Sequence, residues 1–282
     1  MAVLRVPEAR GLTLLEVPSH FAGLRSLQLW WPPRPEDALG ALGAAPVIQA
    51  RQCTPSTCAS LRHRAFRCRP SPTLLLDLAP DPEALWRAFE QKSCRYVIRS
   101  AEKLAWNIGV NDHIGGAMAL IEDYIARSGY TKSPSHRGWG SILDRADVFT
   151  AAHEGTLLAA HIVLADRNRV RLLFSATTER GRKANNRLIG QANRYLHWRE
   201  ILHYREQGVR LYDFGGVDLN RKSPLYSITQ FKLSFGGRVV DEWSIYLARD
   251  RALRTGLRVL SETRLAAKRA HAAGAWRPSF QR

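Results

Sequence analysis

The chain has 282 residues and a mass of 31.8 kDa, which is enough for one large domain or two small ones. Hydrophobic residues make up 45% and charged residues 24%, which argues against a disordered or fibrous protein, and no run approaches the roughly 20 apolar residues that cross a membrane. Lysine and arginine number 42 against 25 acidic residues, and the resulting net charge of +17 favours a polyanionic partner: nucleic acid, anionic lipid or a phosphorylated substrate.

Arginine accounts for 35 of the 42 basic residues, a bias that a GC-rich genome produces by itself, so the net charge is more informative than the choice of arginine. The four cysteines are too few for a disulfide scaffold, and their spacing matches no zinc-binding pattern. Charged residues interrupt the apolar start of the chain, which is therefore not expected to be a signal peptide. We expect a reducing, cytoplasmic setting without a transmembrane segment.

Proline and glycine break up the first part of the chain. Strand-length apolar runs cover residues 12–17 and 46–49, and a convincing strand covers residues 73–78. Asp81 followed by Pro82 predicts a helix start, with the helix continuing to about residue 106.

The second half of that helix is amphipathic. At 100° per residue an apolar face holds Val97, Ile98, Ala101, Leu104 and Ala105, and the opposite face holds Arg95, Arg99 and Lys103. A solvated basic face explains this pattern without any function. The alternative is that the basic face binds an anion, and this interpretation needs further evidence from other segments of the chain.

The middle of the chain changes from helix to strand. A helix is predicted over residues 116–127, followed over residues 128–140 by a loop rich in glycine, serine and proline. Residues 147–177 contain three apolar runs separated by turn sequences at 154–155 and 166–168, which predicts an antiparallel meander.

A long helix over residues 183–207 ends at Gly208, and a strand over 209–217 follows. Two further strands are predicted over 228–235 and 239–247, joined through Gly236 and Gly237. The segment 249–282 is a basic, initially helical tail. This order predicts an α/β protein with a mixed, largely antiparallel sheet.

Standard catalytic patterns are absent from the sequence. There is no nucleophile elbow, phosphate-binding P-loop, zinc-protease motif or dinucleotide fingerprint. His161 and His197 are interpreted as packing or surface residues, and no metal is expected. The segment 212–218 stands apart because its strand ends in two glycines, at the end of a strand where α/β sheets usually bind ligands.

The residues that follow carry a resemblance to a known family. YDFGGV at 212–217 and SPLYSITQFKLSFGG at 223–237 resemble the C-terminal signature of the Fem family of tRNA-dependent aminoacyltransferases, which have a GNAT-like acyltransferase fold. The segment RYVIRSAEK at 95–103 is similar to that family's basic helix. Residues 155–162, Ser175-Ala176 and Asn185-Asn186 fit its middle, so the resemblance covers about 73–248.

The resemblance implies roles for individual residues. Lys232 would stabilise the oxyanion, Tyr212 would contact substrate or backbone, and Asp218 would be a general base; Asp213 would be structural. Residues expected to bind substrate are Phe231, Arg95, Arg99, Lys103, Asn185, Asn186 and Tyr226. A strand-edge lysine that discourages aggregation is the alternative reading of Lys232.

The resemblance also implies a domain organisation. Fem proteins usually have two acyltransferase-like domains and often a helical arm. Here residues 1–72 are expected to be a truncated or vestigial first domain, 73–248 the catalytic domain and 249–282 the basic tail. An acceptor other than the cell wall, such as a peptide or natural-product intermediate, is therefore a live possibility beside a cell-wall precursor.

The implied reaction uses charged tRNA as donor and an amine-bearing acceptor, with no separate cofactor and no DNA. The first alternative is an acyl-CoA-dependent N-acyltransferase of the same fold, which residues 178–184 support poorly because they lack the second small residue of the pyrophosphate-binding pattern. The second alternative is a non-catalytic nucleic-acid-binding module, which would explain the charge but not Lys232 and the loop glycines.

The tail adds a candidate contact for tRNA. Arg251, Arg254 and Arg258 lie close together on a helical projection, and Leu253, Leu257 and Leu260 lie on a different face. The leucines are expected to dock the helix and leave the arginines in solvent. A solvated face and an anionic membrane surface are the other interpretations.

Overall fold

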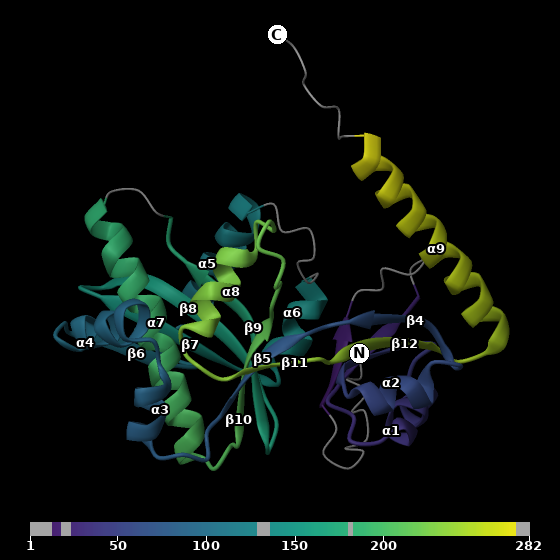
Figure 1. The fold of residues 1–282 in the computed structure, drawn as a ribbon, viewed down its shortest axis with the longest axis horizontal. Helices are drawn as coiled ribbons and strands as arrows, with labels where there is room; N and C mark the ends of the chain where they lie inside the picture. The colour runs from purple at the N-terminus through teal and green to yellow at the C-terminus, as the bar shows by residue number, and fades with distance from the viewer. Residues whose placement is uncertain (1–12, 18–23, 129–135, 180–182, 275–282) are drawn as a thin grey trace, which may run out of the picture. The chain divides into compact units, whose positions relative to one another are not determined.

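The computed structural model describes residues 13–17, 24–128, 136–179 and 183–274 (Figure 1). The chain divides into two compact units, one formed by residues 71–241 and the other by both ends of the chain, residues 1–70 and 242–282. No helix in the described part of the chain is both long and apolar enough to cross a membrane.

The unit of residues 71–241 is built on a seven-stranded mixed sheet with the order β11-β5-β10-β9-β8-β7-β6. Only β9 and β10 run parallel, and the other neighbours are antiparallel. The strands are β5 (Thr73–Asp77), β6 (Trp106–Val110), β7 (Ala146–His153), β8 (Thr156–Ala165), β9 (Arg169–Thr177), β10 (Leu211–Gly216) and β11 (Arg238–Val240). The predicted α/β class with a mixed, largely antiparallel sheet is confirmed.

Helices cover this sheet on both faces. Six consecutive residues of β8, 159–164, are buried, which requires cover on both faces because successive side chains alternate between them. Helices α5 (Ile114–Ser128) and α7 (Lys183–Glu206) both pack on β8, and α4 (Tyr96–Glu102) packs against α7. The remaining helices are α3 (Pro82–Ala88), the π-helical turn η2 (Gln91–Arg95), α6 (His136–Leu143) and α8 (Tyr226–Leu233).

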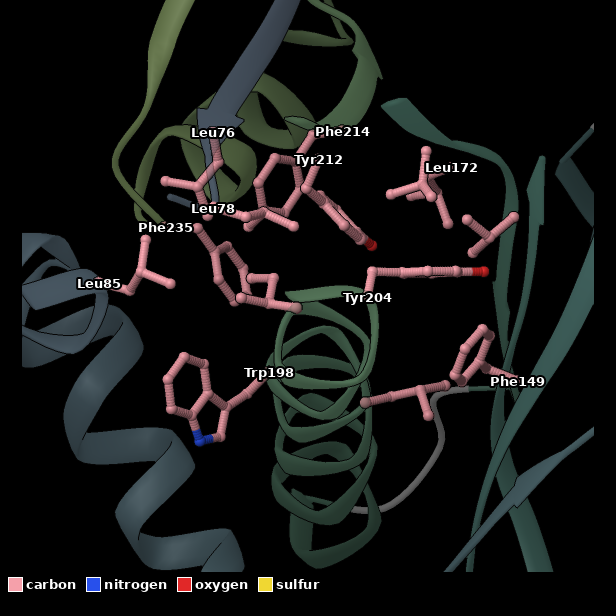
Figure 2. Packing of buried hydrophobic residues seen from close by; sticks show 14 of the residues in the cluster. Leu76, Leu78, Leu85, Phe149, Leu172, Trp198, Tyr204, Tyr212, Phe214 and Phe235 are labelled. Atoms are coloured by element: carbon pink, nitrogen blue, oxygen red, sulfur yellow. The ribbon is translucent and has the colours of Figure 1, made fainter. Parts of the chain in front are cut away.

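The core of this unit is aromatic where α7 meets the sheet (Figure 2). Tyr204 of α7 packs on Phe149 of β7, with ring centroids 5.6 Å apart. Trp198, two turns earlier, packs edge-on to Phe89 at 5.4 Å, and Phe89 packs in the same way on Phe235. These contacts join α7, the segment after α3 and the segment after α8.

The second unit is a five-stranded sheet with the order β1-β2-β3-β12-β4. Its strands are β1 (Thr13–Val17), β2 (Ser26–Trp30), β3 (Val47–Cys53), β4 (Ala65–Pro70) and β12 (Trp243–Ala248). The helices are α1 (Pro35–Gly40), the short 3₁₀ turn η1 (Ala41–Gly43), α2 (Pro55–Leu61) and α9 (Arg251–Gly274). Leu257 of α9 is buried against Val47, Phe66 and Tyr246, and Leu253 is partly buried there.

The prediction of one continuous helix over residues 82–106 is wrong. The segment is broken into α3, η2 and α4, and residues from Trp106 onward form β6. Phe89 leaves the helical conformation because its ring is buried in the aromatic core, and the next residue, Glu90, donates its backbone N–H to the carbonyl of Ser234 at 2.8 Å. Tertiary packing overrides the local helical preference.

Two predicted strands near the end of the chain also differ. Residues 226–233 form α8, a helix whose Thr229 side chain is buried and hydrogen-bonded to the backbone of Asp218. Residues 239–247 are divided between β11, at the edge of the larger sheet, and β12, in the smaller one, so they form no closing hairpin. The buried side chain of Glu242, at the crossing, accepts a hydrogen bond from Gln52 at 2.5 Å.

The predicted loop over 128–140 is helical from His136 onward, because Trp139 is buried on Phe174, with ring centroids 4.7 Å apart. Residues 129–135 of that loop lie outside the described residues. The predicted helices over 116–127 and 183–207 and the meander over 147–177 are confirmed.

Candidate functional site

The site begins where β10 separates from β9. The two parallel strands pair over only three residues, 211–213 with 169–171, although β9 continues to Thr177. Gly215 follows with a φ of +83°, and a Cβ at this position would lie 3.3 Å from the carbonyl oxygen of Leu172. A glycine is therefore needed for β10 to bend away at this point.

Asp213 anchors the base of the separation. Its fully buried carboxylate accepts hydrogen bonds from Arg169 at 2.6 Å, from Arg171 at 2.5 Å, from the Thr73 hydroxyl, and from the backbone N–H of Gly215 at 2.8 Å. Burial alone would raise the pKa of Asp213, but the charges of Arg171 and Arg169 outweigh it and lower the pKa below its ordinary value. The structural role expected for Asp213 agrees with this geometry.

Lys232 of α8 reaches the end of β10. Its half-buried ammonium donates a hydrogen bond to the carbonyl oxygen of Gly216 at 2.7 Å. Burial, followed by the charge of Arg171, lowers the pKa of Lys232 to about 8, against the opposing effect of Asp213. Because Lys232 lies on the helix α8 and not on the edge of a strand, it cannot serve to discourage aggregation at a sheet edge.

An aromatic wall adjoins Lys232. Phe231 is partly buried, and its ring lies 5.7 Å from that of His197 and 5.5 Å from that of Phe235. The Arg194 guanidinium lies 4.7 Å from the centroid of the Phe231 ring, within cation–π distance. The site thus combines a lysine, an arginine and apolar rings.

Beneath this wall lies a buried polar network that links α7 with the two strands β8 and β10. His161 donates or accepts at both nitrogens, 2.6 Å from a Glu200 carboxylate oxygen and 2.7 Å from the Asn193 side-chain oxygen. The Tyr212 hydroxyl donates to Glu200 and lies 2.9 Å from Nδ1 of His197. Of the two contacts expected for Tyr212, with substrate or with backbone, burial contradicts the first, because its side chain points into the core toward α7.

The protonation states in this network follow from burial and charge. Burial alone would raise the pKa of Glu200, but His161 and His197 outweigh it and hold the pKa at about 2. Burial, and then the charge of His161, lower the pKa of His197 to about 4, and Lys232 contributes in the same direction. His197 is therefore a neutral imidazole at pH 7.

Ligand-type atoms of His161, His197 and Glu200 lie within 4.8 Å of one another, which is the grouping of a candidate metal site. Two ligands of one zinc ion, each about 2.0–2.1 Å from it, are separated by roughly 3.3 Å in tetrahedral geometry. The 2.6 Å contact between His161 and Glu200 is a direct hydrogen bond instead. The arrangement fits a hydrogen-bonded network better than a metal centre.

The other residues expected at the site lie in several places. Asp218 is partly exposed and accepts a hydrogen bond from the backbone N–H of Asn220 at 3.0 Å; hydrogen bonds from Ser223 and Asn220 lower the pKa of its carboxyl. It therefore stabilises a turn and is a weaker base than an ordinary aspartate. Tyr226 is half-buried in the first turn of α8, Asn186 is exposed on α7, and the side chain of Asn185 lies outside the described residues.

The basic residues fall into two separate groups. Arg95 and Arg99 line a hollow with Gln91, Lys92 and Tyr96, and Lys103 is exposed just beyond α4. On α9, Arg251 is exposed and Arg254 half-buried, whereas Arg258 donates to the carbonyl oxygen of Ala65 at 3.0 Å. Arg258 is nevertheless exposed, as expected, whereas the expected docking is wrong for Leu260, which is exposed.

The sequence reading missed Arg169, Arg171, Glu200 and the role of His197. The signal for Arg169 and Arg171 is a pair of arginines two residues apart at the start of an otherwise apolar strand, which places both on one face. No local pattern identifies Glu200, because its partners come from β8 and β10.

Solved structures show which fold this is. FemX has a TM-score of 0.58 at 13% identity, over 85% of this chain and 89% of FemX. The C-terminal domain of a putative lysylphosphatidylglycerol synthetase from Agrobacterium fabrum has a TM-score of 0.50 at 14% identity, over 90% of this chain and 88% of that chain. L-PGS from Bacillus licheniformis has a TM-score of 0.50 at 11% identity, over 89% and 88%.

No curated protein sequence matches the chain. The acetyltransferase (GNAT) domain family matches residues 59–223, which include β5 to β10 and Asp213 at the strand separation. That match spans more than half of the chain and agrees with the fold shared with FemX. The protein therefore belongs to the acetyltransferase (GNAT) domain family and is an acyltransferase of the GNAT type.

Proposed function

We propose that the protein transfers an aminoacyl group from charged tRNA to an amine acceptor, forming an amide bond. The observation that carries the proposal is Lys232, whose ammonium lies at the end of β10 beside the bend at Gly215. The likeness to FemX and the net charge of +17 support it further.

The chemistry follows from what an ester-to-amide exchange requires. The neutral acceptor amine attacks the ester carbonyl, the carbonyl oxygen becomes an oxyanion, and the ribose hydroxyl leaves with a proton. Lys232 uses one of its three N–H groups on Gly216, which leaves two for the oxyanion. With a pKa of about 8, most of the Lys232 side chains are protonated at pH 7.

The neighbouring groups have supporting roles in this proposal. Phe231, with Arg194 over its ring, forms a wall for the end of the tRNA. Tyr212 acts as a positioning residue through Glu200 and His197, since its hydroxyl does not reach the surface. Asp218 remains the candidate base, and its turn hydrogen bonds would have to loosen before it accepts a proton.

The acceptor is an amine on a peptide, a natural-product intermediate or a cell-wall precursor. The lysylphosphatidylglycerol synthetases among the similar structures are named for an aminoacylated lipid, so assays should also include an anionic lipid headgroup, whose hydroxyl would be acylated to an ester in place of the amide.

The deciding experiment is incubation with a full set of charged tRNAs and an amine acceptor mixture, with transfer of radiolabelled amino acid as the readout. We expect activity that is abolished by ribonuclease and unaffected by added acetyl-CoA. Transfer that survives ribonuclease would contradict the proposal.

The alternative is acyl transfer from a CoA thioester, which is favoured by the match to the acetyltransferase domain family. Residues 180–182 of the segment that would bind the pyrophosphate lie outside the described residues. Acetylation from radiolabelled acetyl-CoA, insensitive to ribonuclease, would establish this alternative.

A further inference from the structure

The strongest unexplained feature is a hollow of about 240 Å³ beside α4. It is lined by five residues from one short stretch, Gln91, Lys92, Arg95, Tyr96 and Arg99. The π-helical turn η2 passes directly into α4 at Tyr96, and the lining residues, alternately one and three positions apart along this continuous stretch, surround one opening. Turns of this kind occur frequently at functional sites.

The lining is cationic and uncompensated. In the described part of the chain, no carboxylate forms an ion pair with Lys92, Arg95 or Arg99. The buried Nε of Arg95 has no hydrogen-bond partner there either. An unpaired buried donor costs free energy, and three like charges around one hollow repel one another, so an anion bound there would relieve both.

The hollow also has an aromatic rim. Tyr96 is 71% exposed, the highest value among the large hydrophobic side chains of the described residues. An exposed ring beside cations is the arrangement by which proteins hold single-stranded nucleic acid, with a base on the ring and the phosphate on the cations. A lipid headgroup or a free phosphate would use the cations and leave the ring without a role.

The elements that carry the hollow are bonded to and packed against those that carry Lys232. Glu90, next to η2, donates its backbone N–H to Ser234, the residue that ends α8, and α8 carries Phe231 and Lys232. The side chain of Arg99 in turn lies over the Trp86 ring at 5.5 Å, and Trp86 packs on Trp198 of α7. The cations are therefore held on the framework that also positions Lys232.

We propose that this hollow binds one nucleotide of single-stranded RNA, with its base stacked on Tyr96 and its phosphate held by Arg95, Arg99 and Lys92. The inference rests on the proposed function, which it deepens by assigning a subsite to the single-stranded end of the charged tRNA.

The test is the affinity of the full chain for a short, fluorescently labelled single-stranded RNA, measured by anisotropy at several salt concentrations. Tyr96→Leu should weaken RNA binding at least about fivefold, the low end for loss of one stacked base, and leave inhibition by inorganic phosphate unchanged. Arg99→Gln should weaken both and reduce the salt slope by about 0.7. Arg167→Gln is the matched control, since this exposed arginine lies in the turn between β8 and β9.

Wild-type RNA affinity in Tyr96→Leu, or an Arg99→Gln variant that behaves like Arg167→Gln, would overturn the inference. Displacement of the RNA by phosphatidylglycerol vesicles that bind Tyr96→Leu normally would identify a lipid site and also overturn it. Transfer from charged tRNA is assayed separately. If RNA binds at the hollow but no transfer from charged tRNA is detected, only the proposed function is rejected. If transfer occurs but Tyr96→Leu and Arg99→Gln bind RNA as the wild type does, only the RNA subsite is rejected.

Discussion

Lys232 is the single residue on which the proposed chemistry depends most. Lys232→Ala should lower transfer by about 10²–10³-fold, the usual loss for removal of one oxyanion donor. The melting temperature should change little, because the side chain is only half-buried and its hydrogen bond to Gly216 is not part of the hydrophobic core. Circular dichroism melts and transfer rates, with the exposed Lys222→Ala as control, check both statements. Wild-type turnover in Lys232→Ala would remove it from the mechanism.

The pH profile offers an independent check on the same residue. Since the pKa of Lys232 is lowered to about 8, the ammonium loses its proton as pH rises through that value, and transfer should decline above pH 8. Lys232→Arg keeps its charge to much higher pH, so the residual activity of this variant should show no decline there.

His197 makes a prediction about stability. Its pKa is lowered from an unfolded value near 6.5 to about 4, so the unfolded chain binds more protons between these values. Stability should therefore fall as pH falls from about 6.5 to about 4, by no more than about 1.4 kcal/mol per pH unit for this group. The charged or titratable groups that face it are His161, Glu200, Lys232 and Tyr212.

Urea unfolding at several pH values measures this slope. His197→Phe should be less stable at pH 7, because it leaves the Tyr212 hydroxyl with one partner fewer, but its stability should depend less on pH in this window. An unchanged slope in His197→Phe would show that another group titrates there.

At the scale of elements, two glycines with positive φ allow the cost of a strained backbone to be compared with the cost of a steric clash. Gly208, at the end of α7, has a φ of +78° with open space around it, whereas a Cβ at Gly237, between α8 and β11, would lie 2.5 Å from the carbonyl oxygen of Leu75. Gly208→Ala should cost about 1–2 kcal/mol for the left-handed conformation alone. Gly237→Ala should cost roughly 1–3 kcal/mol more, as overpacking does. Equal unfolding midpoints in urea would contradict this ranking.

Elements that depend on local signals could be predicted from the sequence. The meander of β7, β8 and β9 was predictable because turn residues mark both of its connections. The break at Phe89, the helix α8 and the transfer of β12 to the other sheet were not, since each depends on partners far away in sequence.

The site divides in the same way. Arg95 and Arg99 stand out from the pattern of their own segment, and the resemblance of residues 223–237 to the Fem family implies Phe231 and Lys232. The roles of Asp213 and Glu200 depend on hydrogen bonds with Thr73, Arg171 and His161, which are distant in sequence and come together only in the folded sheet.

At the scale of the whole molecule, the net charge of +17 is spread over both units, and α9 carries part of it. Arg251→Gln with Arg254→Gln should flatten the salt dependence of tRNA binding by about 1.4–1.8 units of slope, since each phosphate contact contributes roughly 0.7–0.9. Arg258→Gln should add less than a full phosphate contact, because one N–H of its exposed guanidinium is already bonded to the carbonyl oxygen of Ala65. Turnover at saturating tRNA should stay near normal. An unchanged salt slope in the double variant would show that these arginines of α9 are simply solvated and do not contact tRNA.

The way the chain ends share one sheet has a practical consequence. Pro70 and Trp243 are register partners on β4 and β12, so residues 71–241 are topologically a very long hairpin loop of the smaller unit. Thr73 and Val240 are likewise register partners on β5 and β11. Each unit thus has its cut ends side by side, which suits a design that expresses the larger unit alone and reseals the smaller one with a tight turn. The transfer chemistry could then be assayed with and without the basic helix, as two separately folded proteins.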